Sequence, residues 1–330
     1  MPRAAIRGLG QYLPERVVRN DDLAKMFETS DEWIRQRTGI TERRYVEDGT
    51  GPADLAVKAT ADAVKAAGIQ LTDIEFIIFA TLNPDYFFPG SACILQEKLG
   101  LAGIGALDIR NQCSGFIYSL SVADAFIRMG MYRRILVVGA EVHSSGLEFS
   151  DRGRDVTVLF GDGAGALILE ATEEDCGILS THLHADGRFA QDLWIEAPAA
   201  CMMPRVTPEM LQEGRHYPRM NGKKVFKMAV EKLPEVINEG LRANGLTIDD
   251  VSLFIPHQAN LRINELVARH LKLPPERMYN NIQRYGNTTA ASIPIALNEA
   301  LQEGKAKKGD VVLLAAFGSG FTWGSCLLRL

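Results

Sequence analysis

The sequence predicts an α/β fold made of two similar halves. Three observations support this prediction. Short apolar runs of β type alternate with helical patterns, one stretch of pattern recurs later in the chain, and each half closes with a glycine-rich turn that opens an apolar strand. The 330 residues are 46% apolar and 23% charged, which is typical of a folded globular protein with a large core.

The alternation of strands and helices is clearest before residue 140. Apolar runs typical of buried strands occupy residues 74–80, 106–109 and 135–138, and helical patterns begin between them at about Ser91 and at Ser114. Strands separated by helices form βαβ units. We therefore expect a largely parallel sheet covered by helices.

The recurring pattern indicates a duplication. Residues 66–78 read AAGIQLTDIEFII and residues 243–255 read ANGLTIDDVSLFI, which aligns Gly68 with Gly245, 177 positions later. At the same offset, the strand at 135–138 and the helix that precedes it fall on matching apolar patterns. Three elements in one register predict two halves related by a pseudo-twofold axis, with their sheets packed through shared helices. We place the halves at residues 1–175 and 176–330.

The glycine-rich turns FGDGAGALIL (160–169) and FGSGFTWGSCLL (317–328) contain spacings like those of dinucleotide-binding loops. Each of these turns leads into a strand, whereas the dinucleotide fingerprint leads into a helix. We therefore predict no nucleotide cofactor at either turn.

Charge and cysteine usage argue against several other classes of protein. A net charge of −5 argues against nucleic acid as the main partner. No apolar segment has the length of a signal peptide or a membrane span, so we expect a cytoplasmic location. The five cysteines are widely spaced without a CxxC pair, which indicates free thiols. His182 and His184 form an HxH motif in an apparent loop without a third ligand, so no metal site is expected.

Three polar residues stand at the ends of predicted elements. Cys113 follows the strand at 106–109 and precedes the helix from Ser114, and His257 closes a strand in IPHQAN. Asn287 lies in YGNTTAA, the turn that the repeat matches to the turn of Cys113. Functional groups of α/β proteins gather at the carboxyl ends of strands and the amino ends of helices. We therefore expect the three residues to converge on one site.

A thiol, an imidazole and a carboxamide suit acyl transfer through a thioester. We expect the helix N-terminus and His257 to lower the pKa of Cys113, and backbone N–H groups to bind the oxyanion. A protease can use the same groups, but Asn287 begins a separate helix and suits a second donor to the substrate. Taken singly, Cys113 also fits a small core residue, His257 a hydrogen-bonded turn residue, and Asn287 a turn or helix-cap residue.

Around these residues the sequence resembles the β-ketoacyl-acyl-carrier-protein synthase III family, the fatty-acid-initiating ketosynthases of the thiolase-like superfamily. The matching motifs are TSDEWIRQRTGI (29–40), QCSGF (112–116), DRG (151–153), FGDGAGA (160–166), VFKMAV (225–230), PHQANLRI (256–263), GNTTAASIP (286–294) and FGSGFTWG (317–324). They follow the family's order over nearly the whole chain. The resemblance implies a thiolase-like fold with αβαβα layers.

The resemblance also implies a two-step condensation. Cys113 takes an acyl group from acyl-CoA, and malonyl-acyl-carrier protein then loses CO₂ while His257 and Asn287 stabilise the enolate. The enolate attacks the acyl thioester to give a 3-oxoacyl-carrier protein. The implied oxyanion hole consists of the backbone N–H groups of Cys113 and Ser319. No cofactor is implied, because acyl-CoA is a substrate.

Substrate-binding residues follow from the same resemblance. Trp33 and Arg152 match the pair that encloses the CoA adenine, and Arg37 matches a residue on the CoA phosphates. Lys227 and Arg262 match basic residues that receive the acidic carrier protein. Each of the last two also fits a solvated surface charge.

The resemblance further implies a homodimer. In it, Phe88 reaches across to close the acyl pocket of the neighbouring subunit. On sequence grounds alone Phe88 also fits an ordinary core residue.

The sequence departs from the family pattern in three places. Ser319 stands where the family has the middle of three glycines, and Gln112 stands where it usually has a small residue. Residues 189–218 match poorly, and three of their apolar side chains could line a pocket for a bulky acyl chain or pack in the core: Trp194, Met202 and Met203.

Three functional interpretations are therefore considered. The first is the priming of fatty-acid synthesis from a short or branched acyl-CoA. The second is a related acyltransferase or ketosynthase of a specialised pathway, with a longer or unusual acyl donor or a non-malonyl acceptor. The third is a non-catalytic carrier-protein-binding module, which the intact Cys113, His257 and Asn287 disfavour.

Overall fold

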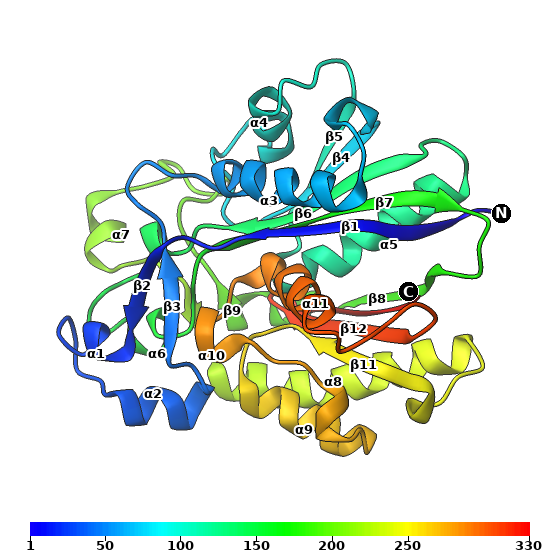
Figure 1. Cartoon of the computed structure of the whole chain (residues 1–330). Coiled ribbons are helices and arrows are strands. Elements are labelled where there is room, and N and C mark those ends of the chain that lie inside the picture. The colour runs from blue at the N-terminus through cyan, green and yellow to red at the C-terminus, as the bar shows by residue number, and fades with distance from the viewer.

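Helices and sheets alternate in five layers in the computed structural model, which describes residues 1–330 (Figure 1). The two outer layers and the central layer are helical. Their helices are α3 (Pro52–Ala67) with α4 (Ser91–Lys98), α5 (Gly115–Arg128) with α11 (Ser292–Gln302) in the centre, and α8 (Gly222–Ala243) with α9 (Leu261–Leu271). The predicted thiolase-like αβαβα layering is thus confirmed.

Each sheet comes from one part of the chain. The first has the strand order β1 (Arg3–Tyr12), β7 (Gly163–Thr172), β6 (Arg134–Glu141), β4 (Phe76–Ala80) and β5 (Gly105–Ile109). The second has the order β11 (Val251–Pro256), β12 (Val311–Gly318), β13 (Thr322–Arg329) and β8 (Gly177–Ala185). The connection from β7 to β8 spans the predicted boundary at residue 175.

The expected largely parallel sheet is only partly correct. β4 runs parallel to β5 and β6, and β11 runs parallel to β12, but the other strand pairs of both sheets are antiparallel. Only residues 319–321 join β12 to β13, which is too short for the crossover that parallel neighbours require. The glycine-rich turn therefore produces a hairpin.

The internal repeat holds residue by residue around the central helices. β12 begins and ends 177 positions after β6, and α11 begins 177 positions after α5. Gln112 and Thr289, also 177 positions apart, are both non-glycine residues with positive φ, at 44° and 47°. Each opens a 3₁₀ turn, Gln112–Ser114 before α5 and Thr289–Ala291 before α11. Such a φ is uncommon outside glycine. The same strained turn therefore leads into both central helices.

The central helices are packed from both sides. Phe116 and Leu120 of α5, with Ile293 and Leu297 of α11, belong to one buried cluster that includes side chains from both sheets. Each large apolar side chain buried in this way contributes about 1.5–3 kcal/mol to folding. This packing holds the turns before α5 and α11 in a fixed relation to each other.

The remaining elements lie mostly at one end of the layers (Figure 1). They are β2 (Arg16–Arg19), α1 (Asn20–Leu23), α2 (Asp31–Thr38), β3 (Glu42–Tyr45), α6 (Arg154–Thr157), β9 (Leu193–Trp194), α7 (Pro208–Gln212), β10 (Arg219–Met220) and α10 (Ile282–Tyr285). The helix α2 begins where the Ser30 hydroxyl accepts the backbone N–H of Trp33 at 3.1 Å, and it ends at Gly39 with φ 81°.

One sequence interpretation changes at this level. His182 and His184 lie on strand β8, and not in a loop, where both hydrogen-bond to Glu239 at 3.2 and 2.6 Å. No group of three or more side chains with metal-binding chemistry is present. All five cysteines are free thiols. None of the helices has the length and apolar character needed to cross a membrane.

Candidate active site

Cys113 occupies the middle of the 3₁₀ turn before α5 and is only 7% exposed. The end of strand β12 lies directly against it. A Cβ atom on Gly318 would lie 2.5 Å from the Cys113 Cβ and 3.0 Å from its Sγ, so only glycine fits at this position. The glycine of the FGSG turn is thus required by the close approach of β12 to the thiol.

Backbone N–H groups face the Cys113 sulfur. Those of Ser319 and of Cys113 itself interact with the sulfur and favour its thiolate, although burial outweighs them. They are the two groups that the resemblance assigns to the oxyanion hole. The Ser319 hydroxyl donates to the carbonyl of Leu193 on β9, so the side chain that replaces the family's glycine is tied to the divergent 189–218 stretch.

His257 follows strand β11 and is 4% exposed. Its Nδ1 lies 2.7 Å from the Ser292 hydroxyl, which also accepts the backbone N–H of Gln258 at 3.3 Å. We assign the Ser292 hydroxyl as the donor to Nδ1, since it then accepts one hydrogen bond and donates another, and this tautomer has the ring proton on Nε2. The buried Nε2 has no partner in the chain. A buried donor of this kind costs about 1–3 kcal/mol when unpaired, so its geometry suits a hydrogen bond to a bound substrate.

Asn287 is fixed in a similar way. Its backbone N–H donates to Leu159 at 2.8 Å, and its carbonyl accepts the N–H of Gly161 at 3.1 Å. The side-chain Oδ1 accepts the backbone N–H of Thr289 at 2.8 Å. The Nδ2 amide makes no hydrogen bond within the chain, so it is a second free donor.

The structure brings these three residues together around strand β12. The backbone N–H of His257 donates to Ala315 at 2.8 Å, while Cys113 packs on Gly318 of the same strand. The 3₁₀ turns that hold Cys113 and follow Asn287 also contact each other. The three residues therefore lie on segments that meet at β12, and the convergence of thiol, imidazole and carboxamide on one substrate stays a prediction.

The charge state of the site differs from the sequence expectation. Burial raises the pKa of the Cys113 thiol to about 12, and the nearby negative charge of Glu141 contributes in the same direction. Burial also lowers the pKa of His257 to about 3. The expected lowering of the thiol pKa is wrong for the free site, because the loss of solvation outweighs the backbone N–H groups. Thiol and imidazole are both neutral at pH 7.

This charge state predicts how Cys113 reacts with iodoacetamide. The thiolate is the reacting form, so the alkylation rate is expected to rise about tenfold per pH unit from pH 6 to pH 9 without a plateau. The rate can be followed by intact mass, with the two exposed cysteines, Cys93 and Cys201, replaced by serine to remove competing sites. A plateau with a midpoint near pH 7 would show a thiolate–imidazolium pair instead.

Glu141 was not singled out from the sequence. Its fully buried carboxylate accepts the backbone N–H of Leu82 at 2.9 Å and that of Ala290 at 3.4 Å, and burial raises its pKa to about 8. In the repeat, Glu141 is equivalent to Gly318 and Ala290 to Cys113, each 177 positions apart. An alignment of the two halves that continued as far as Gly318 would have indicated Glu141, its equivalent in the first half.

His143 is a second buried group that the motifs did not indicate. Its Nε2 lies 2.6 Å from the Thr289 hydroxyl, and its Nδ1 lies 3.1 Å from the side-chain amide of Asn83. Burial and, less strongly, His257 lower its pKa to about 3. His143 therefore supports the turn beside Asn287 as a neutral side chain.

Known proteins match the chain over its full length. Family models described as 3-oxoacyl-[acyl-carrier-protein] synthase III and its C-terminal part match residues 107–187 and 241–330. The β-ketoacyl-[acyl-carrier-protein] synthase III of Xanthomonas campestris pv. campestris is 49% identical, covering 98% of this chain and 97% of that protein. That of Alkalilimnicola ehrlichii is 49% identical, with both chains covered completely.

The chain belongs to the β-ketoacyl-[acyl-carrier-protein] synthase III family. The crystal structure of the Aquifex aeolicus 3-oxoacyl-[acyl-carrier-protein] synthase III superposes with a TM-score of 0.91 at 44% identity, covering 99% of this chain and all of that one. As a member of this family, the chain is an enzyme, an acyltransferase of the ketosynthase type.

The residues predicted to bind CoA are arranged differently from the sequence expectation. Two guanidinium groups lie over the Trp33 ring, those of Arg37 at 4.7 Å and Arg154 at 4.8 Å from the ring centre. Arg152 is not over the ring, because it pairs with Glu148 at 2.6 Å and donates to the carbonyl of Gln212 at 3.2 Å. Sequence matching missed Arg154, since the DRG motif ends one residue before it.

The two residues predicted to dock the carrier protein are both exposed. Lys227 is on α8 and Arg262 is on α9, and these helices pack together. Neither side chain forms an ion pair within the chain, and the Arg262 guanidinium lies 5.6 Å from the ring of Phe226. Their charges are thus available to an acidic partner.

Two of the apolar residues expected near the acyl pocket, Phe88 and Met203, lie on the surface of the single chain, whereas Trp194 and Met202 are half-buried. Phe88 is 80% exposed, which excludes the core interpretation. Met203 is fully exposed, so core packing is wrong for it as well. Arg205, in the same stretch, lies 5.3 Å from the ring of Phe87. The 189–218 stretch therefore contacts the loop that carries Phe88.

Proposed function

We propose that this chain condenses an acyl group from acyl-CoA with malonyl-acyl-carrier protein, releases CO₂ and yields a 3-oxoacyl-carrier protein, the initiating step of fatty-acid synthesis. One observation carries the proposal. A buried thiol faces two backbone N–H groups, and two further donors beside it, on His257 and Asn287, have no partner in the chain.

In the first half-reaction, the Cys113 sulfur attacks the thioester carbonyl of acyl-CoA. The new S–C bond forms as the bond to the CoA sulfur breaks, and the thiol proton ends on the CoA thiol. The N–H groups of Cys113 and Ser319 stabilise the oxyanion. Because the free thiol is neutral, the proton is lost as the attack proceeds, and not beforehand.

In the second half-reaction, the malonyl thioester oxygen accepts hydrogen bonds from His257 Nε2–H and Asn287 Nδ2–H. The bond to the carboxylate carbon breaks, CO₂ leaves, and its electron pair enters the enolate. The enolate carbon then attacks the acyl carbonyl on Cys113, the bond to the Cys113 sulfur breaks, and the departing thiolate takes a proton from solvent. Both donors act on the charge that develops in the transition state, where such bonds are most effective.

The proposal needs no cofactor. Each developing negative charge is stabilised by His257, Asn287 or a backbone N–H group, and the protons pass only between Cys113, the CoA thiol and solvent. Enzyme dialysed against EDTA is therefore expected to retain full activity. The cytoplasmic location expected from the sequence stays a prediction.

A two-stage assay tests the function. The enzyme is incubated with acyl-CoAs of increasing length and branching, adducts are detected by intact mass, and malonyl-carrier protein is then added. We expect adducts with short or branched donors followed by 3-oxoacyl product. Adducts with long donors only, or without condensation, favour the specialised pathway. If no donor gives an adduct, only the interpretation as a carrier-protein-binding module remains.

Arg154 is expected to bind acyl-CoA more strongly than Arg152 does. Loss of a guanidinium from the Trp33 ring costs about 1 kcal/mol, so Arg154→Ala should raise the KM for acyl-CoA about fivefold. Acyl-pantetheine, which lacks the nucleotide, should show unchanged kinetics with the same variant. An equal or larger effect of Arg152→Ala would restore the sequence assignment.

Charge reversal at Lys227 is expected to weaken carrier-protein docking. Lys227→Glu should raise the KM for malonyl-carrier protein about tenfold at low salt and leave the rate of acyl adduct formation unchanged. Lys65→Glu, on the opposite outer layer, is the matched control. An equal response of both variants would show that only net charge matters.

We further propose a homodimer. Tyr86, Phe87 and Phe88 are exposed by 62%, 60% and 80%, and the edge strand β5 is paired on one side only. Exposed aromatic groups and an open edge strand are typical of an interface. Sedimentation is expected to give twice the chain mass, and a fully active monomer would contradict this.

A further inference from the structure

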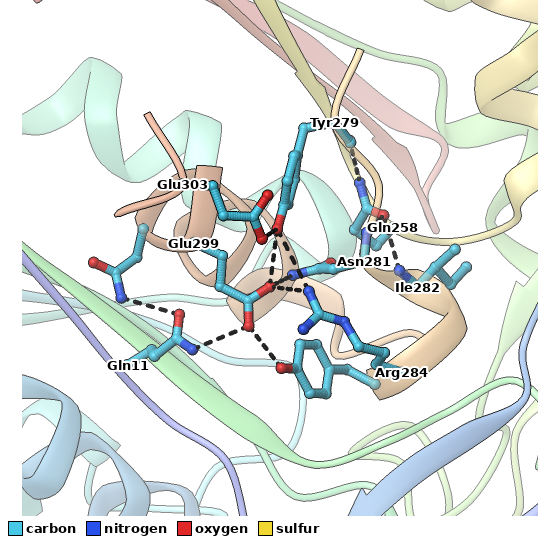
Figure 2. Close-up of polar contacts among 10 residues, drawn as sticks. Gln11, Gln258, Tyr279, Asn281, Ile282, Arg284, Glu299 and Glu303 are labelled. Atoms are coloured by element: carbon cyan, nitrogen blue, oxygen red, sulfur yellow. Dashed lines mark hydrogen bonds and ion pairs between the residues drawn. The ribbon is translucent and has the colours of Figure 1, made fainter. Parts of the chain in front are cut away.

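A carboxylate with many donors lies behind the candidate active site. Glu299 is on α11, is 8% exposed, and is surrounded by donors from two segments of the chain, strand β1 and residues 279–285 (Figure 2). Its hydrogen-bond partners are Tyr285 Oη at 2.6 Å, Arg284 Nη2 at 2.7 Å, Asn281 Nδ2 at 2.9 Å, Gln11 Nε2 at 3.3 Å and Tyr279 Oη at 3.4 Å. A buried carboxylate requires such partners, and here one group serves five donors.

The donors belong to the segment that leads to Asn287. Asn281, Arg284 and Tyr285 are all within six positions of it, and Tyr285 is separated from it by Gly286 alone. Gly286 has φ 64°, and a Cβ there would lie 2.8 Å from the Leu159 carbonyl, so the chain has little freedom at this point. A shift of Tyr285 would therefore be transmitted to Asn287.

The same network reaches His257. Gln258, the next residue, accepts the backbone N–H groups of Asn281 at 3.0 Å and Ile282 at 3.2 Å, and donates to the carbonyl of Pro256 at 2.7 Å (Figure 2). Helix α11 also begins with Ser292, the partner of His257 Nδ1. One helix thus fixes the imidazole at its first residue and holds the Asn287 segment through Glu299, two turns later.

We propose that Glu299 is a positioning residue for the decarboxylation half-reaction, acting through Asn287 and His257. None of its bonds reaches the Cys113 turn, which lies in the other half of the chain. Removal of the shared acceptor releases Asn281, Arg284 and Tyr285 together. A misplacement of about 1 Å at a reacting group can reduce its rate about 100-fold, so decarboxylation is sensitive while acylation is not.

The inference rests on the proposed function, and separate measurement of the half-reactions distinguishes the two. Glu299→Gln keeps the size of the side chain but removes one acceptor atom and the charge opposite Arg284. We expect decarboxylation of malonyl-carrier protein to fall about 10- to 100-fold, with acyl adduct formation on Cys113 within twofold of the unmodified enzyme. The matched control is Glu303→Gln at the C-cap of the same helix, whose carboxylate accepts from Tyr279 at 2.7 Å and from none of Asn281, Arg284 and Tyr285; both rates should stay unchanged.

A purely structural role predicts a different result, because partial unfolding would lower both half-reactions together. Equal loss of both rates, or unchanged decarboxylation, would overturn the proposal. If Glu299→Gln does not fold, Tyr285→Phe removes one donor from the network, and a selective loss of decarboxylation of about threefold or more is then expected. If the unmodified enzyme forms no adduct or releases no CO₂, the proposed function fails and not this inference.

Discussion

Replacement of Cys113 by alanine is expected to abolish acyl adduct formation and to lower condensation by at least about 10⁴-fold, as for the loss of a covalent nucleophile in other enzymes. No other thiol faces the backbone N–H groups at this turn. Decarboxylation of malonyl-carrier protein should continue, because it uses His257 and Asn287. Intact mass detects the adduct, and CO₂ release measures the second half-reaction.

The control for this variant is Cys93→Ser, which removes an exposed thiol on α4 and should leave both half-reactions unchanged. An adduct that persists in Cys113→Ala would refute the assigned nucleophile. Loss of the adduct in Cys93→Ser would point to the same error.

Replacement of His257 by alanine is expected to affect the two half-reactions in the opposite way. The acyl adduct should form at a near-normal rate, whereas decarboxylative condensation should fall about 10²- to 10⁴-fold. The reason is that Nε2–H is a free donor to the malonyl thioester oxygen, while the first oxyanion is held by backbone groups. The pKa of His257 is lowered to about 3, so the step should show no loss of activity from imidazole protonation between pH 5 and pH 8.

The comparison for this variant is His270→Ala, an exposed histidine of α9 that should behave like the unmodified enzyme. Condensation preserved in His257→Ala would refute its role. A fall in activity below pH 6.5 that disappears in the variant would instead show that His257 titrates in the free enzyme.

Much of the fold could be predicted because local pattern and repetition both report on it. The offset of 177 residues located β12 and α11 from β6 and α5. The direction of the neighbouring strands was harder, because parallel and antiparallel pairing depends on connections outside each strand. The HxH pair shows the same limit, since its apparent loop is strand β8, stabilised by pairing with β13.

The candidate site was predictable where a residue sits at the end of an element, and less so where it acts across elements. Cys113, His257 and Asn287 are marked by turns and motifs. Glu299 is not, because its partners lie up to 288 positions away in the sequence. The thiol pKa was predicted in the wrong direction because burial depends on the whole packed core.

The number of acyl groups per chain follows from a difference between the two repeated turns. Cys113 lies against Gly318, whereas Ala290 lies against Glu141. The two turns share a positive-φ residue and a 3₁₀ geometry, but only the first carries a thiol. In the first turn, glycine leaves room for a thioester beside the first N–H. In the second, a carboxylate already accepts the corresponding N–H. Because Ala290 has no nucleophile and its N–H is already taken, each chain holds a single acyl group, on Cys113.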